Sequence, residues 1–171
     1  MRYVIVSFCL SAAACAGGVP NAPTSPSTPT GGAALTEAKR GSALPFRGTL
    51  EAAEIHTGSP PVLHSVLTGT GQATQFGRFT ATFEFDIQLG VPSTTTGSFT
   101  LIAANRDSIS GNLTGRGTVL NGVVTIVETA TITAGTGRFA DATGSVRIDR
   151  VANQTTLTSS GSFDGTINLA H

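Results

Sequence analysis

The sequence predicts an all-β fold, an antiparallel barrel of eight strands, and three observations lead to this prediction. Apolar and polar residues alternate with a period of two along most of the chain after residue 44. No stretch of the same region keeps the period of an amphipathic helix. Clusters of Gly, Pro, Asn and Asp divide the region into segments of strand length. An open β-sandwich is the alternative architecture.

The first fifteen residues have the three-part pattern of an export signal. Arg2 gives a basic start, residues 3–10 form a short apolar stretch, and small residues follow up to Cys15. The apolar stretch is far shorter than the roughly 20 residues that a membrane-spanning helix needs. We therefore predict a signal peptide at residues 1–15 and no membrane-spanning anchor there.

The small residues before Cys15 resemble the signal of bacterial lipoproteins, in which the cysteine thiol is acylated before cleavage. The chain departs from that pattern at Ala12, where Leu is preferred, although Leu10 is close. The resemblance implies that Cys15 is the lipid attachment site and that this anchor makes the only membrane contact. Ala16 then implies the outer membrane. The alternative is ordinary cleavage after Ala14, which leaves a secreted periplasmic or extracellular protein.

Residues 16–43 have the composition of a linker. Pro, Thr, Ser, Gly and Ala dominate this segment, and neither a periodicity nor a cluster of bulky apolar residues is present. Such a segment cannot offset its loss of conformational entropy by burying apolar surface. We predict a disordered tether here and a folded domain at residues 44–171.

Each predicted strand is bounded by turn residues, and the clearest strand lies at residues 78–89. Its odd positions, from Phe79 to Leu89, are apolar, whereas its even positions, from Arg78 to Gln88, are polar, so one face is buried and the other solvated. The eight predicted strands are 44–56, 62–74, 77–90, 94–104, 108–120, 122–134, 143–151 and 155–169.

Eight antiparallel strands close a small up-and-down barrel whose interior is filled by side chains or holds one small ligand. Glycines such as Gly111 and Gly161 lie on the predicted inner faces, as expected where strands bend or approach closely. A barrel with its apolar face toward lipid would carry aromatic girdles. The chain has no Trp, and its one Tyr is Tyr3. We therefore expect a barrel with an inner apolar face.

The triplet Gly-Arg-Phe occurs twice, at residues 77–79 and 137–139. The segments around it, residues 69–79 and 133–144, resemble loops of allene oxide cyclase and dirigent proteins. The chain is similar to bacterial secreted proteins with such a barrel, and the resemblance covers most of residues 44–170, although only the two loops are specific. It implies an eight-stranded, calycin-like barrel with a largely apolar central pocket. The pocket residues of the plant enzymes match no identifiable position of this chain, so their chemistry is not transferred.

The second of these loops has a predicted structural role. We expect Phe139 to plug one end of the barrel, and Arg138 to donate hydrogen bonds to loop carbonyls or to pair with Asp141. The related plant barrels associate as oligomers, so the resemblance implies that this chain can form an oligomer.

Two inner-facing carboxylates are candidate pocket residues. Glu128 shares its parity with the apolar residues of strand 122–134, and an inward carboxylate needs a partner or a raised pKa. A bulge that turns Glu128 outward is the alternative. Glu54 and His56 share the parity of Phe46 and Leu50. His64 follows, but the spacing does not predict a metal site, and we expect no metal or cofactor.

The leading functional hypothesis is a non-catalytic barrel that binds a small apolar ligand in a continuous cavity beneath four Phe side chains. Lys and Arg number 10, as do Asp and Glu, which argues against nucleic acid as a partner. The alternatives are an isomerase or cyclase that acts by confinement, with Glu128 as acid or base, and a packed structural protein of the envelope. The predicted ligand-binding residues are Glu54, Phe83, Phe85, Phe99, Glu128 and Phe163.

Overall fold

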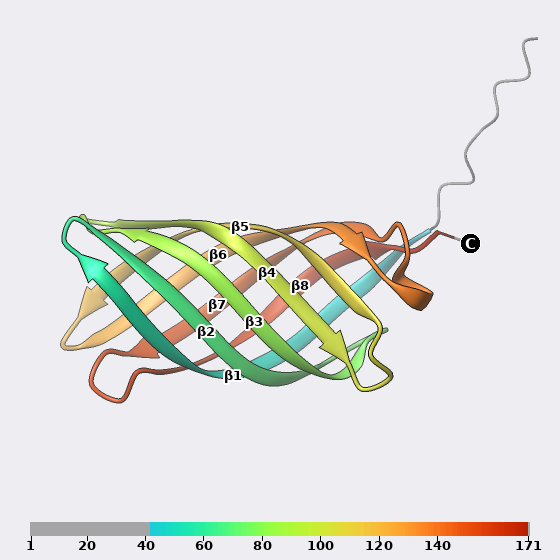
Figure 1. Cartoon of the computed structure of the whole chain (residues 1–171), viewed down its shortest axis with the longest axis horizontal. Helices are drawn as coiled ribbons and strands as arrows, with labels where there is room; N and C mark the ends of the chain where they lie inside the picture. The colour runs from blue at the N-terminus through green and yellow to red at the C-terminus, as the bar shows by residue number, and fades with distance from the viewer. Residues whose placement is uncertain (1–41, 171) are drawn as a thin grey trace, which may run out of the picture. The chain divides into compact units, whose positions relative to one another are not determined.

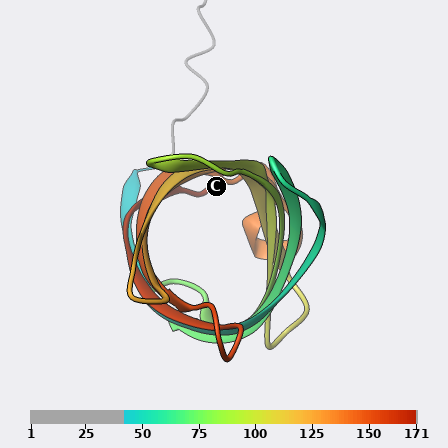
Figure 2. The ribbon, with the colours of Figure 1, turned by 90° about the vertical axis from the view of Figure 1, so that its left-hand side faces the viewer.

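Eight strands follow one another along residues 42–170, the part of the chain that the computed structural model describes. Each strand pairs antiparallel with the next, and β1 pairs with β8, so the sheet closes into a barrel (Figures 1 and 2). The strands are β1 (Ala43–Ser59), β2 (Val62–Ala73), β3 (Gly77–Gln88), β4 (Ser93–Ala103), β5 (Ser108–Leu120), β6 (Val123–Gly135), β7 (Thr143–Asn153) and β8 (Thr158–Asn168). A short 3-10 helix, η1 (Gly137–Phe139), lies between β6 and β7.

The predicted barrel is confirmed, and the sandwich alternative is wrong because the pairing of β1 with β8 leaves no open edge. The largest differences in bounds are at the end of β1, which extends to Ser59 rather than to residue 56, and at β8, which begins at Thr158 rather than at residue 155. The preceding residues form a turn in which Leu157 has a φ of 53°, so they cannot continue the strand. Residues 1–41, which include Cys15 and most of the predicted tether, lie outside the described residues.

The two ends of the barrel differ in what covers them. At one end β1 begins and β8 ends, and the connections β2–β3, β4–β5 and β6–β7 lie there with η1; we call this the plugged end. The other end carries the connections β1–β2, β3–β4, β5–β6 and β7–β8, and we call it the mouth. In Figure 1 the plugged end is on the right, beside the C-terminus.

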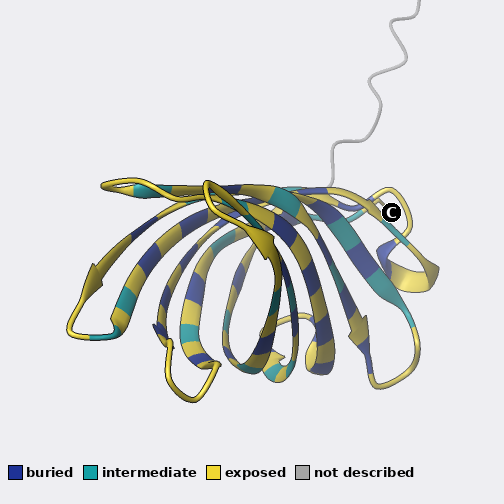
Figure 3. Ribbon diagram, turned by 60° about the vertical axis from the view of Figure 1, so that its left-hand side comes forward, coloured by how far each residue is buried: buried dark blue, intermediate teal, exposed yellow. Residues whose placement is uncertain are grey.

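Side chains alternate between inside and outside along every strand, which appears in Figure 3 as alternating dark and yellow bands. Most of the inward positions hold apolar residues, so the interior is apolar. From the plugged end to the middle of the barrel, Phe side chains fill the interior. Phe46 lies 5.3 Å from Phe163, and Phe83 lies 6.0 Å from Phe99, measured between ring centroids. The space left between these rings is a void of only about 20 Å³.

The two Gly-Arg-Phe loops meet at the plugged end. The Phe139 side chain is fully buried, and its ring centroid lies 4.6 Å from that of Phe76 in the β2–β3 loop. Arg138 donates a hydrogen bond to the carbonyl oxygen of Gln75 at 3.1 Å and stacks over the Phe139 ring. The predicted plug and the bonds to loop carbonyls are thus confirmed. An ion pair of Arg138 with Asp141 is not formed among the described residues.

No helix within residues 42–170 has the length and apolar character required to cross a membrane.

Candidate ligand-binding site

A cavity of about 320 Å³ opens at the mouth of the barrel, and we call it the mouth cavity. Its walls are mainly apolar side chains from the inner faces of the strands. Its inner end is polar and is formed by Glu54 of β1, Thr95 of β4 and Arg150 of β7. The apolar wall residues are Leu63, Phe85, Ile87, Leu89, Val119, Val124, Ile126, Ala152 and Leu157.

Arg150 organises a buried cluster of ion pairs at the inner end of this cavity, which we call the Arg150 cluster. Its Nε and Nη2 atoms donate to the two carboxylate oxygens of Glu128 at 3.2 and 3.0 Å. Its Nη1 atom donates to Glu54 Oε1 and, at 3.1 Å, to Ser159 Oγ. The guanidinium also lies 5.7 Å from the centroid of the Phe85 ring. Arg150, Glu54 and Glu128 are each more than nine-tenths buried.

The charge on Arg150 is stabilised by its partners. Burial alone would lower the pKa of the guanidinium, but the carboxylates of Glu128 and Glu54 outweigh this effect, so the pKa lies above its ordinary value. Arg150 is therefore always charged. Two carboxylates face this single cation, and the Nε2 atom of His56 lies 3.5 Å from Glu54 Oε2.

Gly115 makes room for the Arg150 cluster. It pairs with Glu128 across β5 and β6, and a Cβ atom at this position would lie 2.5 Å from Glu128 Cγ and 2.6 Å from Thr95 Oγ1. Any larger residue would therefore push the Glu128 side chain away from Arg150. This close approach is one physical reason for a glycine on the inner face of β5.

The predicted site residues fall into three groups. Glu54 and Phe85 line the mouth cavity. Glu128 points inward and is buried, because the one register shift between β5 and β6, at Ser110/Gly111, is away from its pair with Gly115. It contacts Arg150 and does not line the cavity. The outward alternative for Glu128 is therefore wrong.

Phe83, Phe99 and Phe163 form the third group and lie in the packed middle of the barrel. The expectation of one continuous cavity beneath these side chains and Phe85 is wrong. The rings occupy the space themselves, because they project from different strands toward the same axis and leave no room for a ligand between them.

Sequence reasoning missed Arg150, Thr95 and Ser159. One pattern could have found Arg150, since it shares the parity of Val146, Ile148 and Ala152 in β7 and is the only charged residue among them. The hydroxyl residues gave no comparable pattern, because Ser and Thr are also common on the outer faces of the strands.

His64 lies away from the cavity, on the outer face of β2, where its Nδ1 atom is 3.0 Å from Asp86 Oδ1 of β3. Within residues 42–170, no three His, Cys, Asp or Glu side chains are grouped so that they could hold a metal ion.

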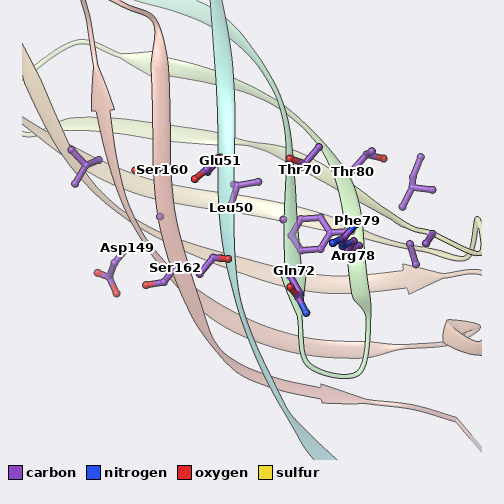
Figure 4. Close-up of a pocket in the computed structure, with 17 residues that line it drawn as sticks. Leu50, Glu51, Thr70, Gln72, Arg78, Phe79, Thr80, Asp149, Ser160 and Ser162 are labelled. Carbon is purple, nitrogen blue, oxygen red and sulfur yellow. The ribbon is translucent and has the colours of Figure 1, made fainter.

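A wider hollow of about 980 Å³ lies on the outer wall of the barrel and crosses β7, β8, β1, β2, β3 and the end of β4 (Figure 4). Its polar side chains, such as Glu51, Gln72, Arg78 and Asp149, are exposed and point outward. A ligand there would stay largely in contact with water. The mouth cavity, although smaller, is surrounded by the barrel wall and is the better candidate for a binding site.

Comparison with solved structures finds a protein with a similar fold. A structure of the pterocarpan synthase dirigent protein GePTS1 matches with a TM-score of 0.56 and 9% sequence identity, over 86% of this chain and 98% of that chain. The protein therefore has a dirigent-like β-barrel fold. Comparison of the sequence with protein-family models and with curated proteins finds no match.

Proposed function

We propose that this protein is a non-catalytic binding module that holds one small, mainly apolar ligand in the mouth cavity. The observation that carries the proposal is the cavity itself. A volume of about 320 Å³ lies at the lower end of the roughly 300–1,000 Å³ typical of small-molecule sites, and the lining is mainly apolar with a few polar groups. A dirigent-like barrel fits such a role.

A substitution that fills the cavity tests this proposal. Ala152 lines the cavity on β7, and Val151 beside it points outward. We expect the chain carrying Ala152→Phe to bind the uncharged fluorophore N-phenyl-1-naphthylamine at least about tenfold more weakly, because the new ring occupies the binding space. The measurement is a fluorescence titration, made without detergent on chains that also carry Cys15→Ser.

Val151→Phe is the matched control, since it adds the same ring to the same strand outside the barrel, and it should bind the fluorophore like the parent chain. Equal binding by the Ala152→Phe and Val151→Phe chains would rule out the mouth cavity as the site. Thermal unfolding of both chains shows that the barrel is intact.

Confinement catalysis is a second candidate function, favoured by the position of Glu54 and His56 in the same cavity. Glu128 does not line the cavity and is not the acid or base of this candidate. Mass spectrometry of a ligand that co-purifies with the protein, before and after incubation, separates the two functions. A binding module returns the ligand unchanged, whereas an isomerase returns it rearranged.

We also propose that the chain is exported and anchored through a lipid on Cys15. The small residues before Cys15 support this, and so does the start of β1 at the plugged end, which leaves the mouth on the opposite side of the barrel. We expect intact-mass measurement of the chain from a bacterial host to show a mature N-terminus at Cys15 carrying a diacylglycerol. Cys15→Ser should abolish the added mass and the membrane association. An unmodified Cys15 would contradict the anchor.

A further inference from the structure

We propose that the mouth cavity selects ligands that carry a cationic ammonium head on an apolar body, with the head bound at Glu54. This inference rests on the proposed function, because it names the chemical class of ligand for the same cavity. It follows from the charge balance of the Arg150 cluster, from polar atoms that lack partners, and from the position of the apolar residues.

The charges at the inner end of the cavity do not balance. Arg150 is the one guanidinium there, and Glu54 and Glu128 supply two carboxylates, so one formal negative charge is left over when His56 is neutral. A buried carboxylate without full compensation is costly, and a bound cation removes that cost. The excess therefore favours a positively charged ligand.

The excess charge is accessible at one atom. Glu54 Oε1 is bound to Arg150, whereas Glu54 Oε2 forms no hydrogen bond with any side chain or backbone group of residues 42–170. The Nε2 atom of His56 lies 3.5 Å from this oxygen, beyond good hydrogen-bond distance. Glu54 lines the cavity, so this oxygen can accept a hydrogen bond from a ligand N–H group.

A second acceptor lies in the same cavity. Thr95 is about nine-tenths buried and lines the cavity, and its Oγ1 atom has no hydrogen-bond partner within the described part of the chain. An alkylammonium has three N–H donors and no acceptor. It thus matches the unpartnered oxygen of Glu54 and the hydroxyl of Thr95. His56 Nδ1, a ring nitrogen of the same cavity lining, also lacks a partner within residues 42–170.

An anionic ligand does not fit this site. Arg150 is the only Lys or Arg side chain that lines the cavity, and all three of its nitrogen atoms already donate to Glu128, Glu54 or Ser159. Only one N–H of Arg150 Nη2 is left for a ligand carboxylate, which would also meet the excess negative charge.

The apolar residues define the orientation of the ligand. Around the mouth, large apolar side chains are exposed, and Leu89, Val119 and Leu157 among them line the cavity. Val91 in the β3–β4 loop and Leu120 at the end of β5 are also exposed. An amphiphilic amine would therefore enter with its head first and leave its apolar end among these residues.

A matched series of eight-carbon compounds tests the inference: n-octylamine, 1-octanol and octanoate. The affinity of each compound is measured by its displacement of N-phenyl-1-naphthylamine from the chain carrying Cys15→Ser. The titrations are made at pH 8.0, where an ordinary imidazole is neutral. We expect octylamine to bind at least about tenfold more tightly than octanol, because a hydrogen bond to a charged acceptor is stronger than one between neutral groups. Octanoate should bind more weakly than octanol.

Two variants assign the preference to named atoms. Glu54→Gln should reduce the ratio of octylamine to octanol affinity by about tenfold, and Thr95→Val should lower it by a smaller factor. Glu51→Gln changes a carboxylate on the outer face of the same strand and should leave the ratio unchanged. Binding of the fluorophore shows that the cavity of each variant is intact.

The outcomes separate the inference from the proposed function. If the fluorophore and octanol bind but octylamine has no advantage, the ammonium preference is wrong and the binding module stands. If octanoate binds best, or if Glu54→Gln keeps the preference, the role of Glu54 is likewise overturned. If neither the fluorophore nor any of the three compounds binds, the proposed function fails together with the inference.

Discussion

Arg150→Ala is expected to lower the free energy of unfolding by about 3–5 kcal/mol, the typical cost of removing one partner of a buried ion pair. The substitution leaves the carboxylates of Glu54 and Glu128 buried with no cation between them. It also removes the hydrogen bond to Ser159. Urea unfolding followed by circular dichroism measures the change.

Arg147→Ala is the matched control for this substitution. Arg147 lies on the same strand but points outward, where it pairs with Asp149 and both side chains are more than half exposed to solvent. Because water and salt screen such a pair, we expect the urea midpoint of Arg147→Ala to stay close to that of the parent chain. Similar midpoints for the Arg150→Ala and Arg147→Ala chains would contradict the structural role of the Arg150 cluster.

A triple variant keeps the prediction testable if Arg150→Ala does not fold. Arg150→Met combined with Glu54→Gln and Glu128→Leu removes all three charges at once. Replacement of a buried ionic cluster by apolar groups is often neutral or stabilising, so this chain should unfold at a higher urea concentration than Arg150→Ala. A higher urea midpoint for the triple variant would show that Arg150→Ala loses stability through the unpaired carboxylates rather than through lost packing.

Phe139→Ala is expected to destabilise the barrel by about 3–5 kcal/mol, the usual range for removal of a fully buried Phe side chain. The ring fills the plugged end, packs on Phe76 and lies beneath the Arg138 guanidinium. Its loss leaves a cavity that the rigid strands around it cannot collapse to fill. The measurement is again the free energy of unfolding in urea.

The same variant provides a test that separates the two ends of the barrel. The mouth cavity lies at the end opposite Phe139. In conditions where Phe139→Ala is folded, it should bind N-phenyl-1-naphthylamine as the parent chain does. A Phe139→Leu chain should lose less stability, because Leu refills part of the space. A midpoint unchanged by Phe139→Ala would show that the ring does not plug the barrel.

Local alternation accounts for the part of the fold that the sequence predicts correctly. Each strand is long enough to show a period of two, as in β3, where Phe79, Phe83 and Phe85 alternate with polar residues. The turn residues that separate the strands are also local features. The strand number and the inner faces therefore follow from short stretches of chain, each interpreted by itself.

The site depends on contacts that no short stretch contains. Glu54 and Arg150 are 96 residues apart in sequence and meet because β1 closes the barrel beside β8 and β7. Glu128 was found from its parity, yet its partner could not be named without the register of β6 against β7.

By itself, the sequence determined the eight strands, their order and the side chains that face inward, because these depend on a local period and on turn residues. Only the tertiary structure decided which inner side chains fill the barrel and which leave it hollow. That outcome depends on how the closed sheet brings distant strands to one level, where Phe83, Phe99 and Phe163 fill the middle and Glu54, Thr95 and Arg150 meet below an open mouth.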